Sequence, residues 1–378
     1  MTAAARQEQK VQQTLAEERR RRLAAAMREA GIGHLVLYGN AWQGDYLRYG
    51  ADFGILEGHG IALIAADGAA ELYLDSAVEA ERAELEAPFV RVHFAPDIAR
   101  AVGARLDRVA KERLAAAPRR FLPRFLADPA RSFTLSDGTA LVDKLLMHKS
   151  EGEIAAVRRA AQIADEAYGE FLKAVRPGRR QFEIVADIEA HLRLRGCPDN
   201  FMIIGSGGKD VLGMTPPSER QIAAGDLVTT ELTPAVEGYF AQICRTLVVG
   251  KASEAQRRAF AVFVEALEAG IAAVRPGVRA ADVARAENDV FRKHGLGEYT
   301  TSQWTRVRGH GMGLFADSKP HILEDVNTVL EEGMTLIVHP NTYHPEAGYI
   351  VLGDAVVVTE RGAEVLCKTP RQLFEVAA

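Results

Sequence analysis

The feature that most constrains the fold is an internal repeat in the second half of the chain. The segment Ala174-Val-Arg-Pro-Gly-Arg-Arg180 recurs as Ala273-Val-Arg-Pro-Gly-Val-Arg279. In each copy a long helix runs into the Arg-Pro-Gly turn, and a second amphipathic helix follows. Strands are expected after each helix pair, over 201–204, 227–232 and 242–249 and then over 335–339 and 355–358. The pattern predicts a duplicated helix–helix–sheet domain with a ligand site between its halves, because clefts between repeats are common sites.

The part of the chain before the repeat alternates strand-like and helical runs. The first thirty residues predict one amphipathic helix, which Gly31 ends. Short runs of strand character then alternate with helical stretches to about residue 145, which is typical of a small α/β unit. A Pro-rich patch over 118–129 and a capping box of Ser150 and Glu153 mark a boundary. We therefore expect two domains, 1–147 and 148–378.

Composition and charge narrow the class of partner. Hydrophobic residues make up 48% of the chain and charged residues 26%, an ordinary globular mixture. The 46 Lys and Arg against 51 Asp and Glu leave a net charge of −5, which offers no basic surface for nucleic acid or anionic membrane. The three cysteines, Cys197, Cys244 and Cys367, are too few to cross-link a chain of this length. We expect a cytoplasmic protein that acts on a small molecule, with no nucleic-acid or membrane partner.

A series of short motifs follows the expected boundary. They are Lys149-Ser-Glu-Gly-Glu-Ile154, Gly225-Asp-Leu-Val228, Gly238-Tyr239, Arg245-Thr246, Gly309-His-Gly-Met-Gly313, Glu332-Gly-Met334 and Gly353-Asp354. Their order is that of the creatinase/aminopeptidase P family, which the chain resembles. The resemblance implies an α+β protein whose duplicated C-terminal domain has the pita-bread fold and whose smaller N-terminal α/β domain is creatinase-like. It also implies a hydrolase and a homodimer.

The resemblance also indicates where this chain departs from the family. The family's peptidases hold two metal ions with two Asp, one His and two Glu, and the matching positions here are Glu231, Gln242, His310, His339 and Gly353. Two divalent ions about 3.5 to 4 Å apart need anionic bridging ligands, and Gln242 is neutral while Gly353 has no side chain. We therefore expect no metal pair and no cofactor. One divalent metal on Glu231, His310 and His339 stays an open alternative.

Creatinase is the family's example of catalysis without metal, but the position of its catalytic His is Met214 here. Creatine is therefore not the expected substrate. His310, Glu231 and His339 are instead the candidate catalytic residues, since a carboxyl and two imidazoles suffice for acid–base chemistry near neutral pH. The candidate substrate-binding residues are Gln242, Cys244, Asp317 and Met214, with Trp42 and Tyr46 of the N-terminal domain.

The leading hypothesis is a metal-independent, creatinase-like hydrolase of a C–N bond in a small amide or amidine-type compound. His310 would be the general acid/base, with Glu231 assisting it or holding a cationic group. Gln242 and His339 would position the reacting carbon or stabilise its developing charge. Three alternatives remain: a mononuclear metal-dependent Xaa-Pro peptidase-like hydrolase, a lyase that begins with proton abstraction, and a non-catalytic pita-bread binding protein.

Overall fold

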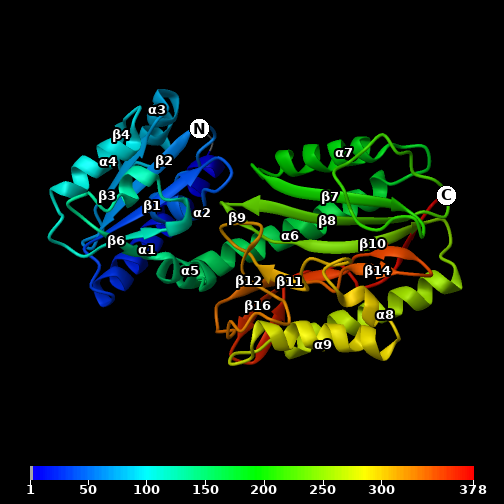
Figure 1. Cartoon of the computed structure of the whole chain (residues 1–378). Helices are drawn as coiled ribbons and strands as arrows, with labels where there is room; N and C mark the ends of the chain where they lie inside the picture. Colours follow the sequence, from blue (N-terminus) through cyan, green and yellow to red (C-terminus); the bar gives the residue numbers. More distant parts are fainter. Residues whose placement is uncertain (1–2) are drawn as a thin grey trace. The chain divides into compact units, whose positions relative to one another are not determined.

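The computed structural model describes residues 3–378, with side chains from Thr14 onward, and the chain divides into two compact units (Figure 1). The units are Met1–Leu146 and Met147–Ala378. Within the described part of the chain, every helix is too short or too polar to cross a membrane.

The N-terminal unit is built on a six-stranded mixed sheet with the strand order β4-β3-β2-β1-β5-β6. The strands β1, β2 and β3 pair antiparallel, whereas β3–β4, β1–β5 and β5–β6 are parallel. The expected first helix is present, and its residues Leu23 and Met27 are fully buried. The elements are α1 Ala3–Glu29, β1 His34–Asn40, α2 Asp45–Ala51, β2 His59–Ala65, β3 Ala70–Leu74, α3 Ala77–Glu86, β4 Arg91–Phe94, α4 Ile98–Asp107, β5 Leu114–Ala117, β6 Leu135–Asp137 and α5 Thr139–Met147, with short 3₁₀ turns at Arg119–Phe121 and Arg124–Ala127.

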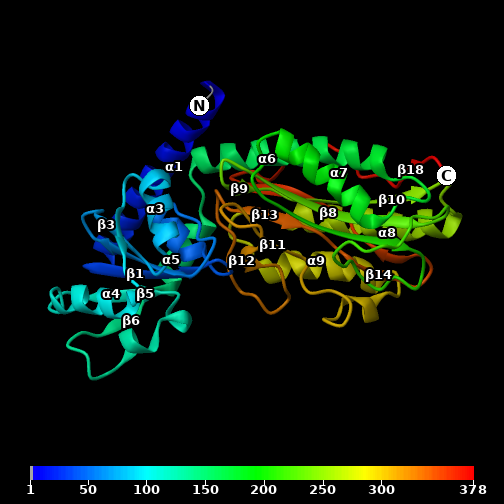
Figure 2. The same cartoon turned by 90° about the horizontal axis from the view of Figure 1, so that it is seen from above.

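The C-terminal unit contains the duplication that the repeat predicts. Its first half consists of α6 Glu151–Ala174, α7 Gln181–Leu194, β7 Asn200–Gly207, β8 Leu227–Val236, β9 Tyr239–Phe240 and β10 Ile243–Val249. Its second half consists of α8 Glu254–Ala273, α9 Ala280–Lys293, a 3₁₀ turn Gly297–Thr300, β11 Gly309–Gly311, β12 Ser318–His321, β13 Thr335–Val338, β14 Thr342–His344, β15 Gly348–Ile350, β16 Gly353–Thr359, β17 Gly362–Val365 and β18 Phe374–Val376. Figures 1 and 2 show each helix pair running alongside the strands of its own half.

The two Arg-Pro-Gly turns have the same structure. Gly178 and Gly277 have φ values of +82° and +86°, the left-handed region that favours glycine. Each glycine N–H donates to a carbonyl of a later segment, Ile222 in the first half at 2.8 Å and Leu330 in the second at 2.9 Å. The repeat therefore encodes a turn that docks each helix pair on its own half.

One sheet joins the halves, in the strand order β12-β11-β13-β16-β10-β8-β7. The junction is the antiparallel pair β10–β16, in which Cys244 is opposite Gly353 and Ile243 is opposite Asp354. The expected strands are all present, but β10 begins at Ile243, so that Gln242 lies just before the strand. The predicted capping box is also present, since Ser150 and Glu153 bond each other's backbone N–H at the start of α6.

Candidate active site

A cavity of about 410 Å³ lies in the C-terminal unit and draws its walls from both halves of the sheet. This volume is within the range of small-ligand sites. It brings together six residues predicted from the sequence, which are Met214, Glu231, Gln242, His310, Asp317 and His339. The other lining residues are Phe201, Ile203, Thr305, Arg306, Val307, Ala316, Asn341 and Tyr349.

Three of the predicted substrate-binding residues do not line this cavity. Cys244 is fully buried beside it, where its thiol contacts Glu231 and accepts a hydrogen bond from Gln242 Nε2 at 3.4 Å. Trp42 and Tyr46 belong to the N-terminal unit. Trp42 is 93% exposed, and the Tyr46 hydroxyl donates to Asp143 Oδ1 at 2.5 Å.

Glu231 projects from β8 and is 9% exposed. Burial raises the pKa of its carboxyl to about 7, although hydrogen bonds from Cys244 and Asn341 oppose this rise. Asn341 Nδ2 donates to Glu231 Oε1 over 2.7 Å. Burial also raises the pKa of the Cys244 thiol, as does the nearby Glu231, so the thiol stays protonated and can donate. A carboxyl with a pKa near 7 can release or accept a proton at neutral pH.

His310 lies on β11, and its tautomer follows from one contact. Its Nδ1 is 2.9 Å from the carbonyl oxygen of Gly311. Because a carbonyl can only accept, Nδ1 carries the hydrogen and Nε2 keeps its lone pair. Burial lowers the pKa of His310, while Asp317, whose Oδ1 is 3.8 Å from Nδ1, raises it. His310 is therefore a neutral imidazole with an available acceptor nitrogen.

His339 follows β13, and its ring is perpendicular to that of His310, with 5.6 Å between the ring centroids. Burial lowers the pKa of His339 to about 3, and His310 adds to this effect. The ring is 5% exposed, and its Nδ1 is buried without a hydrogen-bond partner. His339 is thus held neutral in the cavity wall.

Asp317 is held ionised at the cavity. Burial raises the pKa of its carboxyl, but a hydrogen bond from His321 Nε2 at 3.0 Å, the neighbouring His310 and an ion pair with Arg306 together keep that pKa well below its ordinary value. Because His321 and Arg306 already contact the Asp317 carboxylate, Asp317 is better placed to tune the imidazole of His310 than to bind a cationic substrate.

The sequence profile of metallopeptidase family M24 matches residues 155–360, which is more than half of the chain. The chain belongs to metallopeptidase family M24. The Xaa-Pro dipeptidase of Pyrococcus furiosus is 32% identical over 236 residues, 62% of this chain and 67% of that protein. The Xaa-Pro dipeptidase of Pyrococcus horikoshii is 31% identical over 228 residues, 60% of this chain and 64% of that protein. The chain thus spans about two thirds of these relatives' length.

Solved structures agree with the M24 assignment. The Xaa-Pro dipeptidase from Bacillus anthracis superposes with a TM-score of 0.80 at 28% identity, covering 96% of this chain and all of that one. Membership in the pita-bread family, the α+β fold class and the hydrolase class of the family are therefore confirmed. The homodimer and the cytoplasmic location stay predictions.

The name of the M24 family implies metal ions. Two divalent ions need several anionic ligands, and this chain offers few of them at the matching positions. At the β10–β16 junction, a Cβ added to Gly353 would lie 2.6 Å from His339 Cβ and 3.2 Å from Cys244 Sγ. His339 and Cys244 therefore fill the space in which a side chain from position 353 would begin. Glu231 is the only carboxylate among the five positions, and its pKa is raised. This donor set does not fit a pair of divalent ions.

A single ion fits no better. Among residues 14–378, no group of three or more His, Cys, Asp and Glu side chains has an arrangement suited to holding a metal. Glu231, His310 and His339 share the cavity wall but do not form such a group.

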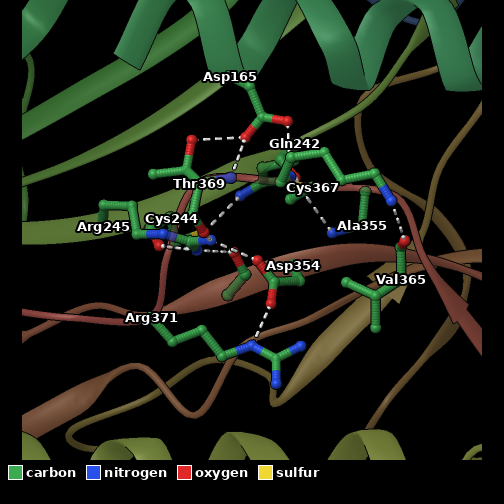
Figure 3. Close-up of polar contacts among 12 residues, drawn as sticks. Asp165, Gln242, Cys244, Arg245, Asp354, Ala355, Val365, Cys367, Thr369 and Arg371 are labelled. Carbon is green, nitrogen blue, oxygen red and sulfur yellow. Dashed lines mark hydrogen bonds and ion pairs between the residues drawn. The ribbon is translucent and has the colours of Figure 1, made fainter. Parts of the chain in front are cut away.

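A buried ionic network lies at the β10–β16 junction (Figure 3). Arg245 and Asp354 are 0% and 1% exposed and form an ion pair with 2.6 Å between Nη2 and Oδ1. Arg245 Nη1 also donates to the Gly353 carbonyl at 2.7 Å, and Arg371 Nε donates to Asp354 Oδ2 at 2.6 Å. The two halves of the sheet are thus joined by charge-assisted bonds away from water.

Several cavity residues could not be predicted from the sequence, and the polar ones are Asn341, Tyr349, Arg306 and Thr305. Asn341 is 3% exposed and Tyr349 is partly buried. The one sequence signal for Asn341 was its place two residues after His339, between two expected buried segments. Thr305, Arg306 and Tyr349 carry no such signal, because nothing in the sequence places these residues at the cavity.

Proposed function

We propose that this M24 chain hydrolyses the amide C–N bond of a small, dipeptide-sized compound through its own acid and base side chains, without a metal pair. The observation that carries the proposal is the pairing, in one cavity, of a carboxyl with a pKa near 7 and a neutral imidazole with a free acceptor nitrogen. Because the relatives are named Xaa-Pro dipeptidases, a peptide-type amide is supported better than the amidine-type compound of the leading sequence hypothesis.

The side chains divide the reaction between them. His310 Nε2 removes a proton from water, and the resulting oxygen nucleophile attacks the carbonyl carbon of the amide. The protonated form of Glu231 then donates its proton to the amide nitrogen as the C–N bond breaks, which yields a carboxylic acid and an amine. Transfer of the proton from His310 to Glu231, directly or through solvent, restores both groups to their starting states.

The remaining cavity residues orient the substrate. The second N–H of the Gln242 amide and the neutral ring of His339 can donate to the carbonyl oxygen as negative charge develops on it. Phe201, Ile203 and Met214 form an apolar wall for the substrate's non-reacting part. The roles of Trp42 and Tyr46 in substrate selection stay predictions.

His310→Ala tests the proposal. With Xaa-Pro dipeptides as probes, we expect turnover to fall at least about 100-fold, as for loss of a general base, with the melting temperature retained. His294→Ala is the matched control, since His294 lies outside the cavity and pairs with Glu265. Undiminished turnover of the His310→Ala protein would refute the assignment.

Metal dependence is tested on the same purified protein as turnover. We expect turnover to persist in the presence of a chelator and metal analysis to find less than one equivalent. One equivalent of zinc, iron or manganese, with turnover lost to the chelator, would support the mononuclear peptidase alternative instead. An unsaturated product would indicate the lyase, and tight dipeptide binding without product would indicate a binding protein.

A further inference from the structure

Asn341 connects the two halves of the cavity through its side chain. It lies between β13 and β14, and its Oδ1 accepts the backbone N–H of Leu352 at 3.0 Å. A backbone N–H can only donate, so this contact fixes which end of the amide is oxygen. The amide nitrogen must then face Glu231, whose Oε1 is 2.7 Å away.

The main chain of Asn341 is held as firmly as its side chain. Its N–H donates to the His339 carbonyl at 2.8 Å, and its carbonyl accepts Arg308 Nη1 at 3.1 Å. Arg308 is 1% exposed and is itself fixed by Asn288 Oδ1, which accepts its Nε at 2.6 Å. An amide anchored at both ends can hold the carboxyl of another strand in one orientation.

We propose that Asn341 is a positioning residue, whose N–H fixes the rotation of the Glu231 carboxyl toward the scissile bond. The proposal rests on the acid role of Glu231 in the proposed function. The polar groups that share the surroundings of Glu231 are Cys244, Arg306, Asp317, Tyr349, His310 and His339. Of the hydrogen bonds described to Glu231, the one from Asn341 is the one whose donor is itself locked by backbone contacts on either side.

The Asn341→Asp variant distinguishes a role of Asn341 in orienting Glu231 from a role in supporting the fold. The new side chain keeps the oxygen that accepts from Leu352, and it replaces only the amide NH₂ that contacts Glu231 and Cys244. We expect kcat to fall about 100-fold, as for a misplaced catalytic group, with KM changed less than about threefold. Asn327→Asp, which makes the same charge change at an exposed site, is the control and should leave both constants unchanged. A kcat within about twofold of the wild-type value overturns the proposal, because twofold is far below the cost of misplacement.

A second measurement does not depend on turnover. At pH 8.5, where Glu231 is ionised, Asn341→Asp should lower the melting temperature, since two carboxylates then face each other. In the Glu231→Gln background the Gln amide can donate to the new carboxyl oxygen, so that the same change should lower the melting temperature less. Equal losses in the two backgrounds would show that residues 231 and 341 are not coupled and would overturn the proposal. Absence of turnover in the wild-type protein would instead count against the proposed function, so the two failures are distinguishable.

Discussion

Glu231→Gln should remove turnover and also make the folded protein more stable above neutral pH. Burial raises the pKa of the Glu231 carboxyl from 4.5 to about 7, so the folded chain keeps a proton there that the unfolded chain releases. A raised pKa means that the stability contribution of this group is fully present below pH 4.5 and is lost as pH rises toward 7. At about 1.36 kcal/mol for each pH unit, the loss reaches about 3 kcal/mol and then stays constant.

The assay is urea unfolding of the wild-type and Glu231→Gln proteins between pH 5 and 8.5. We expect the free energies of unfolding to be similar near pH 5 and to diverge in favour of the variant, by about 3 kcal/mol at pH 8. The Gln side chain keeps an oxygen that can accept from Asn341 Nδ2, so the packing is little changed. Glu298→Gln, at an exposed position, controls for removal of one charge. A difference that is independent of pH, or that favours the wild type at high pH, would refute the reasoning.

Two further changes test other parts of the structure. Gly353→Ala should lower the free energy of unfolding by about 1 to 3 kcal/mol, because its Cβ would lie 2.6 Å from His339 Cβ and 2.9 Å from the Val338 carbonyl oxygen; an unchanged urea midpoint would contradict this packing. Glu287 is fully buried with neither carboxyl oxygen hydrogen-bonded, and burial raises its pKa despite Arg308. Glu287→Gln should therefore gain stability over the wild type as pH rises from 5 to 8, and a gap that narrows with pH would contradict the raised pKa.

The repeat made much of the C-terminal fold predictable. A shared turn with a helix on each side dictates two similar halves, and a site between them follows from how repeats pack. The cavity residues Glu231 and Gln242 come from the first half, and His310 and His339 from the second. These four are predictable from the sequence, because each lies within or a few residues from a short motif whose order matches the family.

The missed features depend on contacts between residues far apart in the chain. The Asn341–Glu231 hydrogen bond joins positions 110 residues apart, and no local sequence pattern predicts it. The place of Cys244 follows from strand register, which sets it opposite Glu231 on one side and Gly353 on the other. A period-two pattern shows which face a residue occupies but not its cross-strand neighbour, so Cys244 was expected in the cavity and lies beside it.

The fold is duplicated, but the two halves contribute different residues to the site. The junction between the halves therefore determines how these residues are placed. The proposed acid comes from the first half, whereas the proposed base and the amide that orients the acid come from the second. The position of the acid relative to the base depends on the β10–β16 pairing, because that pair joins the two halves of the sheet. The buried Arg245–Asp354 ion pair and the close packing at Gly353 lie at this pairing. An ion pair there is weak evidence for stability, since burying two charges is costly, but removing one partner would leave the other uncompensated. We infer that the network serves to hold one strand register, and with it the distance between acid and base.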